Sequence, residues 1–244
     1  MLAPVGVAII GGTGEEGFGL AVRLGRAGVD VVIGSRAAER GATAAQKARG
    51  IAGPDTSITG TSNEDAATAD VVLVTVPFAG QAEIYRSIRG AVKDGAVVCD
   101  ATSPVASAVG RPAWQILTPW EGSAAEQAKA ILPNGVRMVS GFHTLSAEAL
   151  HEYDRALEGD VLLCGGDPEA KAVVGALVER LPDLRWVDAG PLSMARVIER
   201  LTALLISVNR QYGTRDAGVR LIGRGSWGPP PPRPARPSGA GPGP

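Results

Sequence analysis

Three glycines follow a short apolar run near the start of the chain and have the spacing G-x-G-x-x-G: Gly12, Gly14 and Gly17. Between a strand and a helix, the first allows a tight turn, the second lets the backbone approach a pyrophosphate, and the third lets helix and strand pack closely. N–H groups at the start of that helix then bind the anion. Glycine-rich turns are common, so a purely structural turn is the alternative.

The residues on either side of these glycines favour a dinucleotide site. An apolar run, residues 5–10, precedes them and is typical of a buried strand. A stripe at helical spacing follows them and stops at Gly28: Leu20, Ala21, Leu24 and Ala27. A strand, a glycine turn and a helix in this order are the context that the spacing requires.

The next candidate residues choose between two forms of the dinucleotide. In an NAD-binding unit, an Asp or Glu about 20 residues beyond the glycines binds the ribose 2′-hydroxyl. Ser35 and Arg36 stand at that position here, with Arg40 one helical turn further on. A carboxylate would repel a 2′-phosphate, whereas a hydroxyl and guanidinium groups bind it. We therefore predict NADP(H), the alternative being a solvated arginine that opens a surface helix.

Other kinds of catalytic group are not predicted. His143 and His151 are eight residues apart and have no third ligand at metal spacing, so no metal site is expected. His143 follows an apolar run, where a structural and a functional histidine are both compatible with the sequence. Hydride transfer between two ring systems needs alignment and exclusion of water, and no nucleophile or catalytic dyad.

The elements that position these residues have the pattern of a doubly wound parallel α/β sheet, a Rossmann domain. Strands are expected near residues 5, 31, 58, 71, 96 and 136, with helices between them. In such sheets ligands bind at the carboxyl ends of the strands. Residues at two strand ends are therefore assigned to the cofactor site: Val76, Pro77, Phe78 and Ala101.

The last third of the chain changes character. Strands are expected at 160–164 and 184–188, helices at 168–181 and 193–212, and 218–222 is a candidate short strand. We predict a Rossmann domain over 1–142 and a smaller C-terminal α/β domain over 143–224 that closes the crevice. Residues 225–244 are rich in proline and glycine and are predicted to be a disordered tail.

Composition excludes several classes of protein. The formal net charge of −1 gives no sign of a nucleic-acid-binding or membrane surface. Cys99 and Cys164 lie in apolar runs without CxxC or Cys/His spacing. No signal peptide is recognisable, and no apolar stretch reaches the roughly 18 residues of a membrane span. We expect a cytoplasmic protein that binds neither nucleic acid nor membrane.

Six segments, in this order, resemble the NADPH-dependent coenzyme F420 reductases, also called F420-dependent NADP oxidoreductases. The resemblance covers roughly the first 222 residues. The segments are Ile10–Gly14, Gly34–Arg36, Glu121–Glu126, Phe142–Leu145, Asp188–Leu192 and Val197–Thr202. The family implies hydride transfer between C4 of nicotinamide and C5 of the 5-deazaflavin F420, by a homodimer of chains with a Rossmann domain and a small C-terminal domain.

The resemblance also implies site residues. Those for NADP are Thr13, Gly14, Glu15, Glu16, Ser35, Arg36 and Arg40, and those for the deazaflavin are His143, Arg196 and Thr202. Arg196 is assigned to a polar edge of the deazaflavin and Thr202 to packing against its ring. Two carboxylates beside a pyrophosphate would repel it, so the side chains of Glu15 and Glu16 are predicted to point away from it.

Two other functions remain open at this point. One is an NADP-dependent reductase of a small carbonyl or imine, which would need a proton donor, with His143 as the candidate. The other is a non-catalytic NADP-sensing module. Analogy of fold alone does not separate these functions.

Overall fold

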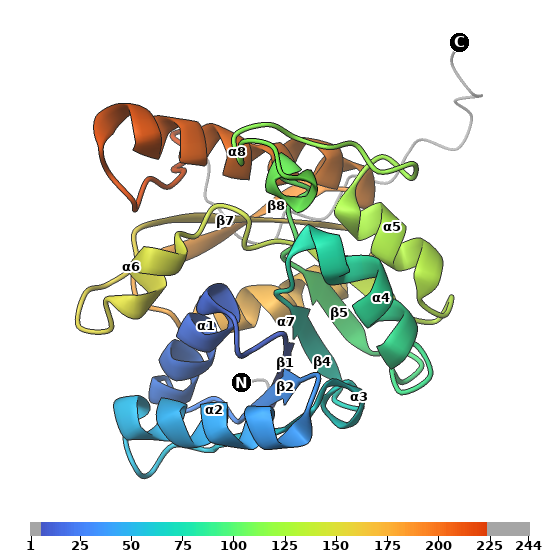
Figure 1. Ribbon diagram of the computed structural model, residues 1–244, viewed down its shortest axis with the longest axis vertical. Coiled ribbons are helices and arrows are strands. Elements are labelled where there is room, and N and C mark those ends of the chain that lie inside the picture. The colour runs from blue at the N-terminus through green and yellow to red at the C-terminus, as the bar shows by residue number, and fades with distance from the viewer. Residues whose placement is uncertain (1–5, 224–244) are drawn as a thin grey trace, which may run out of the picture.

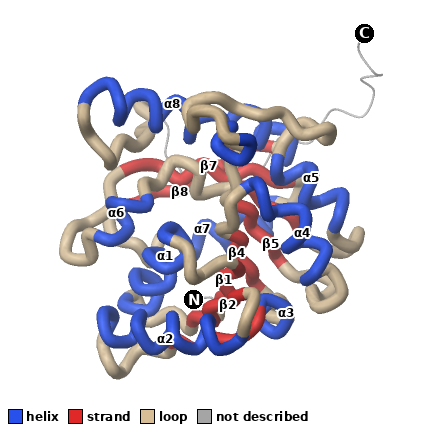
Figure 2. Tube along the Cα trace, viewed as in Figure 1, coloured by secondary structure: helices blue, strands red, loops and turns tan. Residues whose placement is uncertain are grey.

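Strand β1 (Val7–Ile10) is apolar at every position because both of its faces are buried. Val7 and Ile9 pack into one hydrophobic cluster, and Ala8 and Ile10 pack into another. The computed structural model, which describes residues 6–223, accordingly has a sheet between two layers of helices (Figures 1 and 2).

The sheet contains eight strands in the order β3-β2-β1-β4-β5-β6-β7-β8. All neighbours are parallel except β6 and β7, which are antiparallel. The strands after β1 are β2 (Val31–Ser35), β3 (Ile58–Ser62), β4 (Val71–Val74), β5 (Val97–Asp100), β6 (Arg137–Ser140), β7 (Gly159–Gly165) and β8 (Leu184–Gly190). The order reverses between β1 and β4, which is where open α/β sheets bind ligands.

Helices cover the two faces of the sheet in two groups. One hydrophobic cluster includes residues of α1 (Glu15–Arg26), α2 (Ala38–Ala52), α6 (Ala147–His151) and α7 (Pro168–Val178). The other includes residues of α3 (Asn63–Ala66), α4 (Phe78–Ile88), α5 (Ala124–Ile131) and α8 (Ala195–Tyr212). Figure 1 shows α8 running across the carboxyl-end side of the sheet, with the irregular segment before α5 beside it.

The predicted doubly wound α/β fold is confirmed, and the sheet departs from the predicted parallel arrangement at β6 and β7. Strands β7 and β8 continue the same sheet through the antiparallel pairing with β6. The division into domains at residue 142 stays a prediction, and the predicted tail, 225–244, lies outside the described residues.

The candidate strand at 218–222 is not formed, which corrects that expectation. The Asp160 N–H donates to the Val219 carbonyl at 2.8 Å, but the Leu221 N–H donates to the Asp160 carboxylate at 2.6 Å instead of to a backbone carbonyl. The Asp160 side chain thus accepts from the N–H group that would otherwise form a second hydrogen bond of the β-ladder.

Candidate active site

The glycine turn joins β1 to α1 and has the features predicted for an anion site. Gly11 has a φ of +78°, a conformation that favours glycine. A Cβ on Gly17 would lie 2.8 Å from Gly12 Cα and closer still to Thr75 Oγ1, so only glycine lets α1 pack here. Gly14 precedes α1, and no side chain within residues 6–223 caps the first turn. Its N–H groups are therefore free to bind a phosphate, and the turn fits a pyrophosphate.

The residues predicted to recognise the 2′-phosphate lie where β2 ends. Ser35 is the last residue of this strand and is buried, whereas Arg36 and Arg40 are exposed. Neither arginine forms an ion pair with a carboxylate in the described part of the chain. Two unpaired guanidinium groups beside a strand end suit a phosphate monoester.

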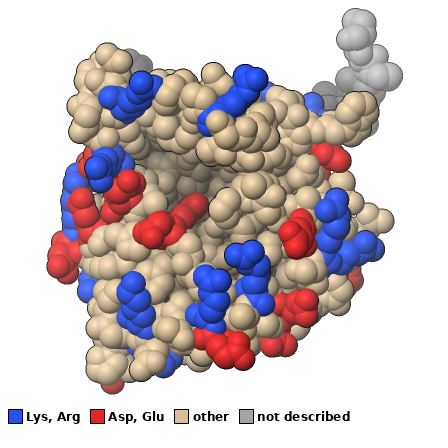
Figure 3. All heavy atoms as spheres, viewed as in Figure 1, with Lys and Arg blue, Asp and Glu red and all other residues tan. Residues whose placement is uncertain are grey.

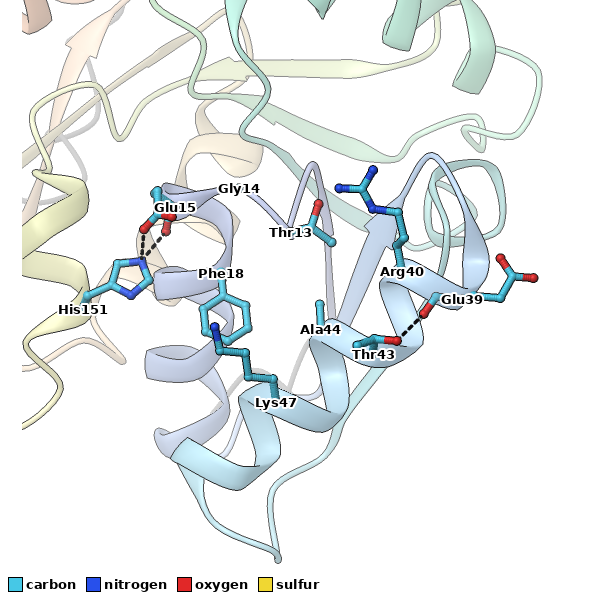
Figure 4. A pocket seen from close by; sticks show the side chains of 10 residues that line it. All are labelled: Thr13, Gly14, Glu15, Phe18, Glu39, Arg40, Thr43, Ala44, Lys47 and His151. Carbon is cyan, nitrogen blue, oxygen red and sulfur yellow. Dashed lines mark hydrogen bonds and ion pairs between the residues drawn. The ribbon is translucent and has the colours of Figure 1, made fainter.

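A groove of about 470 Å³ lies between the amino-terminal halves of α1 and α2 (Figure 4). Thr13 and Arg40, both predicted to bind NADP, line it together with Lys47, which the sequence did not single out. The Lys47 ammonium lies 5.2 Å from the centre of the Phe18 ring. The groove meets the glycine turn at Gly14, so a dinucleotide on the turn would border these cations.

A second hollow, a crevice of about 540 Å³, lies at the carboxyl ends of β4 and β5. Figure 3 shows the molecule hollowed between the region of α8 and the body below it. Seven of the predicted cofactor residues line the crevice: Gly14, Glu15, Glu16, Val76, Pro77, Phe78 and Ala101. His143 and Thr202 line it as well, so the residues predicted for two binding partners meet in one place.

β6 ends at Ser140, and His143 lies three residues beyond it. Phe142 then adopts a φ of +71°, which is uncommon for a residue with a side chain. Such a conformation persists only where the surroundings enforce it. Phe142 is buried and also lines the crevice, so the turn places two aromatic side chains there.

A chain of hydrogen bonds holds His143. Its Nε2 is 2.8 Å from Ser140 Oγ, and its Nδ1 is 3.2 Å from Ser103 Oγ. Ser103 Oγ is 2.6 Å from Thr202 Oγ1, and Thr202 Oγ1 donates to the His143 carbonyl at 2.9 Å. A carbonyl oxygen only accepts, so the Thr202 hydroxyl uses its proton on it and must accept from the Ser103 hydroxyl. Ser103 has then used its own proton, so it accepts from the Nδ1–H group of His143. Every partner is satisfied when His143 is neutral.

Burial agrees with this assignment, because desolvation lowers the pKa of His143 to about 4 from an ordinary value of 6.5. The imidazole therefore carries no positive charge near neutral pH. It can orient a ring but holds no readily released second proton.

The neutral His143 predicts a pH dependence of folding. Between the two pKa values the unfolded chain binds a proton that the folded chain does not, so the unfolding free energy falls as the pH drops from about 6.5 towards 4. His143→Asn should remove about 1–2 kcal/mol of the loss between pH 7 and pH 5. Urea unfolding of both proteins at pH 7 and pH 5 measures this loss of unfolding free energy. An equal loss in both proteins would contradict a buried neutral imidazole.

Arg196 is not brought to the crevice. Its Nε and Nη2 donate to the Glu126 carboxylate at 2.7 and 2.8 Å, and Nη2 also donates to the Glu121 carbonyl at 3.1 Å. On the same helix, buried Glu199 accepts from the N–H groups of Ala124 and Ala125 at 2.9 and 3.0 Å. These contacts fix α8 on the start of α5, and the predicted contact of Arg196 with the deazaflavin remains untested.

The two glutamates after Gly14 point in different directions. Glu15 is exposed, and its carboxylate lies 3.2 Å from His151 Nε2. Glu16 lines the crevice half-buried, where desolvation, and then the charge of Asp100, raise its carboxyl pKa to about 8. A protonated Glu16 would add no negative charge beside a phosphate.

Several residues of the site were not found by sequence reasoning. Thr102 and Ser103 directly follow Ala101 at the end of β5, so the rule that selected Ala101 could have found them. The roles of His151 and Glu199 depend on contacts 136 and 75 residues away, for which the sequence gives no local signal. Within residues 6–223, no three acidic, histidine or cysteine side chains gather as a metal site would require.

Comparison with known proteins finds a matching family and similar reductases. Residues 6–104 match the family described as NADP oxidoreductase, coenzyme F420-dependent. The F420-dependent NADP reductase of Methanothermobacter thermautotrophicus is 43% identical over 218 residues, which are 88% of this chain and 94% of the relative. The chain belongs to the F420-dependent NADP reductase family. The predicted family is therefore confirmed, and with it an oxidoreductase that uses NADP(H) and F420.

A second reductase of this family, from Methanocaldococcus jannaschii, is 36% identical over 219 residues, 88% of this chain and 97% of the relative. Among solved structures, a proposed F420-dependent NADP reductase from Arthrobacter sp. FB24 superposes with a TM-score of 0.71. It is 23% identical and covers 89% of this chain and 99% of its own. That likeness supports the fold alone. None of the helices among the described residues is both long and apolar enough to cross a membrane.

Proposed function

We propose that the crevice is where a hydride passes between NADP(H) and F420. The observation that carries this proposal is the continuity of the crevice with the glycine turn, since Gly14 and Glu15 line both hollows. A nucleotide held by its pyrophosphate at the turn can extend one end into the crevice and the other towards Arg36 and Arg40. When bound, the two groups supply the hydride donor and acceptor.

The residues of the chain contribute orientation and exclusion of water. Val76, Pro77 and Phe142 give the crevice apolar walls. The chain of hydroxyls through Ser103 fixes His143 and Thr202 relative to each other. Fixed walls of this kind limit the rings to arrangements close to the reactive one, which lowers the entropic cost of hydride transfer.

Mixing the purified protein with NADPH and oxidised F420 tests this function, because reduction removes the visible absorbance of the deazaflavin. We expect the absorbance to fall with NADPH and to fall much more slowly with NADH. Bound NADPH with unchanged absorbance would favour the sensing module. Oxidation of NADPH only in the presence of a small carbonyl or imine would favour the other reductase.

We also propose that the protein is a homodimer of cytoplasmic chains, each divided near residue 142. The dimer is supported by the outer face of α8, where Val197 and Leu204, two turns apart on one face of the helix, are 53% and 56% exposed. Large apolar side chains exposed in a stripe are typical of an interface.

Leu204→Glu should convert the dimer into monomers, because a carboxylate buried in an apolar interface without a partner is costly. Sedimentation should then give one chain mass, 24.9 kDa, in place of twice that value. Val109→Glu, which alters another exposed apolar residue, is the matched control and should leave the mass unchanged. If the Leu204→Glu protein were still a dimer, the interface would not lie on this face of α8.

A further inference from the structure

The short helix α6 is locked against the first turns of α1. Gly19 allows this approach, since a Cβ there would lie 2.7 Å from Leu150 Cβ. Arg23, from the same face of α1, donates to three carbonyl oxygens around the end of α6 at 2.7–2.8 Å. His151, the last residue of α6, is thereby held beside Glu15, the first residue of α1.

The imidazole of His151 is held on both nitrogens and one face. Nε2 lies 2.8 Å from the Glu15 carbonyl oxygen and 3.2 Å from its carboxylate, and both of these only accept, so Nε2 carries a proton (Figure 4). Nδ1 lies 3.1 Å from the Tyr153 hydroxyl. The ring stacks on Phe18, with centres 6.0 Å apart and planes 12° from parallel. These contacts together fix the His151 ring in one orientation.

Glu15 carries a negative charge beside the proposed site of the pyrophosphate. Its own N–H group belongs to the first turn of α1, which is the proposed site of the pyrophosphate. A carboxylate at a helix amino terminus is attracted by the same N–H groups and dipole as a phosphate. A free Glu15 side chain would therefore compete with the ligand or repel it.

We propose that His151 is a positioning residue for NADP(H), which draws the Glu15 carboxylate sideways and leaves the start of α1 open to the pyrophosphate. This inference rests on the proposed placement of the nucleotide at the glycine turn. His151 also joins the segment after β6 to the nucleotide-binding turn, so a local contact couples the two parts of the site.

A double-mutant cycle with NADPH as the probe tests the proposal. His151→Phe keeps a ring on Phe18 but removes both nitrogens, and it should raise the Kd for NADPH about tenfold, the scale of one unscreened charge contact. Glu15→Gln should bind NADPH at least as tightly as the wild type. In the double variant the effect of His151→Phe should vanish. Tyr153→Phe, which removes only the Nδ1 partner, is the control and should retain the wild-type Kd.

The salt dependence of the Kd for NADPH distinguishes an electrostatic role of His151 from a role in folding. Charge repulsion is screened, so the defect of His151→Phe should shrink when the salt is raised to about 1 M. The proposal would be overturned, in favour of a folding role, if His151→Phe raised the Kd equally in the wild-type and Glu15→Gln backgrounds, or equally at both salt concentrations. An unchanged Kd in His151→Phe would overturn it as well. A wild-type protein that does not bind NADPH would overturn both this proposal and the proposed function.

Discussion

Replacing His143 with alanine is expected to slow hydride transfer about 100-fold without abolishing it. The neutral imidazole lines the crevice and is oriented by Ser140 and Ser103, so it acts on ring alignment and not on proton supply. The Kd for NADPH should change little, because the nucleotide is held by the glycine turn and the end of β2. Single-turnover loss of F420 absorbance measures the rate, and fluorescence titration measures the Kd.

Two further variants sharpen this prediction. Ser140→Ala removes one support of the imidazole and leaves the ring in place, so it should give a smaller loss of rate than His143→Ala. Circular dichroism checks that both variants fold. Complete inactivity of a folded His143→Ala protein that still binds NADPH would point to an obligatory acid, and to the carbonyl or imine reductase instead.

Arg36→Ala is expected to raise the Kd for NADPH between about tenfold and 100-fold, the loss that follows removal of a hydrogen bond to a charged group. The Kd for NADH should hardly change, since NADH lacks the 2′-phosphate. Fluorescence titration with both nucleotides measures the two effects. Arg36 is exposed and lies at the end of a strand, so the variant should fold normally.

Arg86→Ala serves as the matched control for this prediction. Arg86 lies on α4, where it lines a separate hollow with residues near the end of α5. Its loss should leave both Kd values unchanged. Equal increases of the two Kd values in Arg36→Ala would show that this guanidinium does not read the 2′-phosphate.

What the sequence determined by itself was local or followed from the rules of parallel sheets. The glycine turn lies within one stretch of chain, and its steric demands at Gly17 are met by adjacent elements. Val76, Pro77 and Ala101 were assigned to the cofactor site as strand ends, and they line one crevice because the carboxyl ends of neighbouring parallel strands meet at one edge. Continuous apolar runs predicted strands that are buried on both faces, and the doubly wound order of helices and strands followed from them.

What only the tertiary structure decided was the direction of side chains whose partners are distant in sequence. Buried Glu199 of α8 accepts from the Ala124 N–H at the start of α5, and this contact sets the rotation of α8 about its axis. Arg196 is thereby turned towards Glu126 while Thr202 faces the crevice. Likewise, His151 meets Glu15 only because α6 packs on α1. Helical spacing gives relative angles along one helix, but the absolute rotation comes from packing against the rest of the chain.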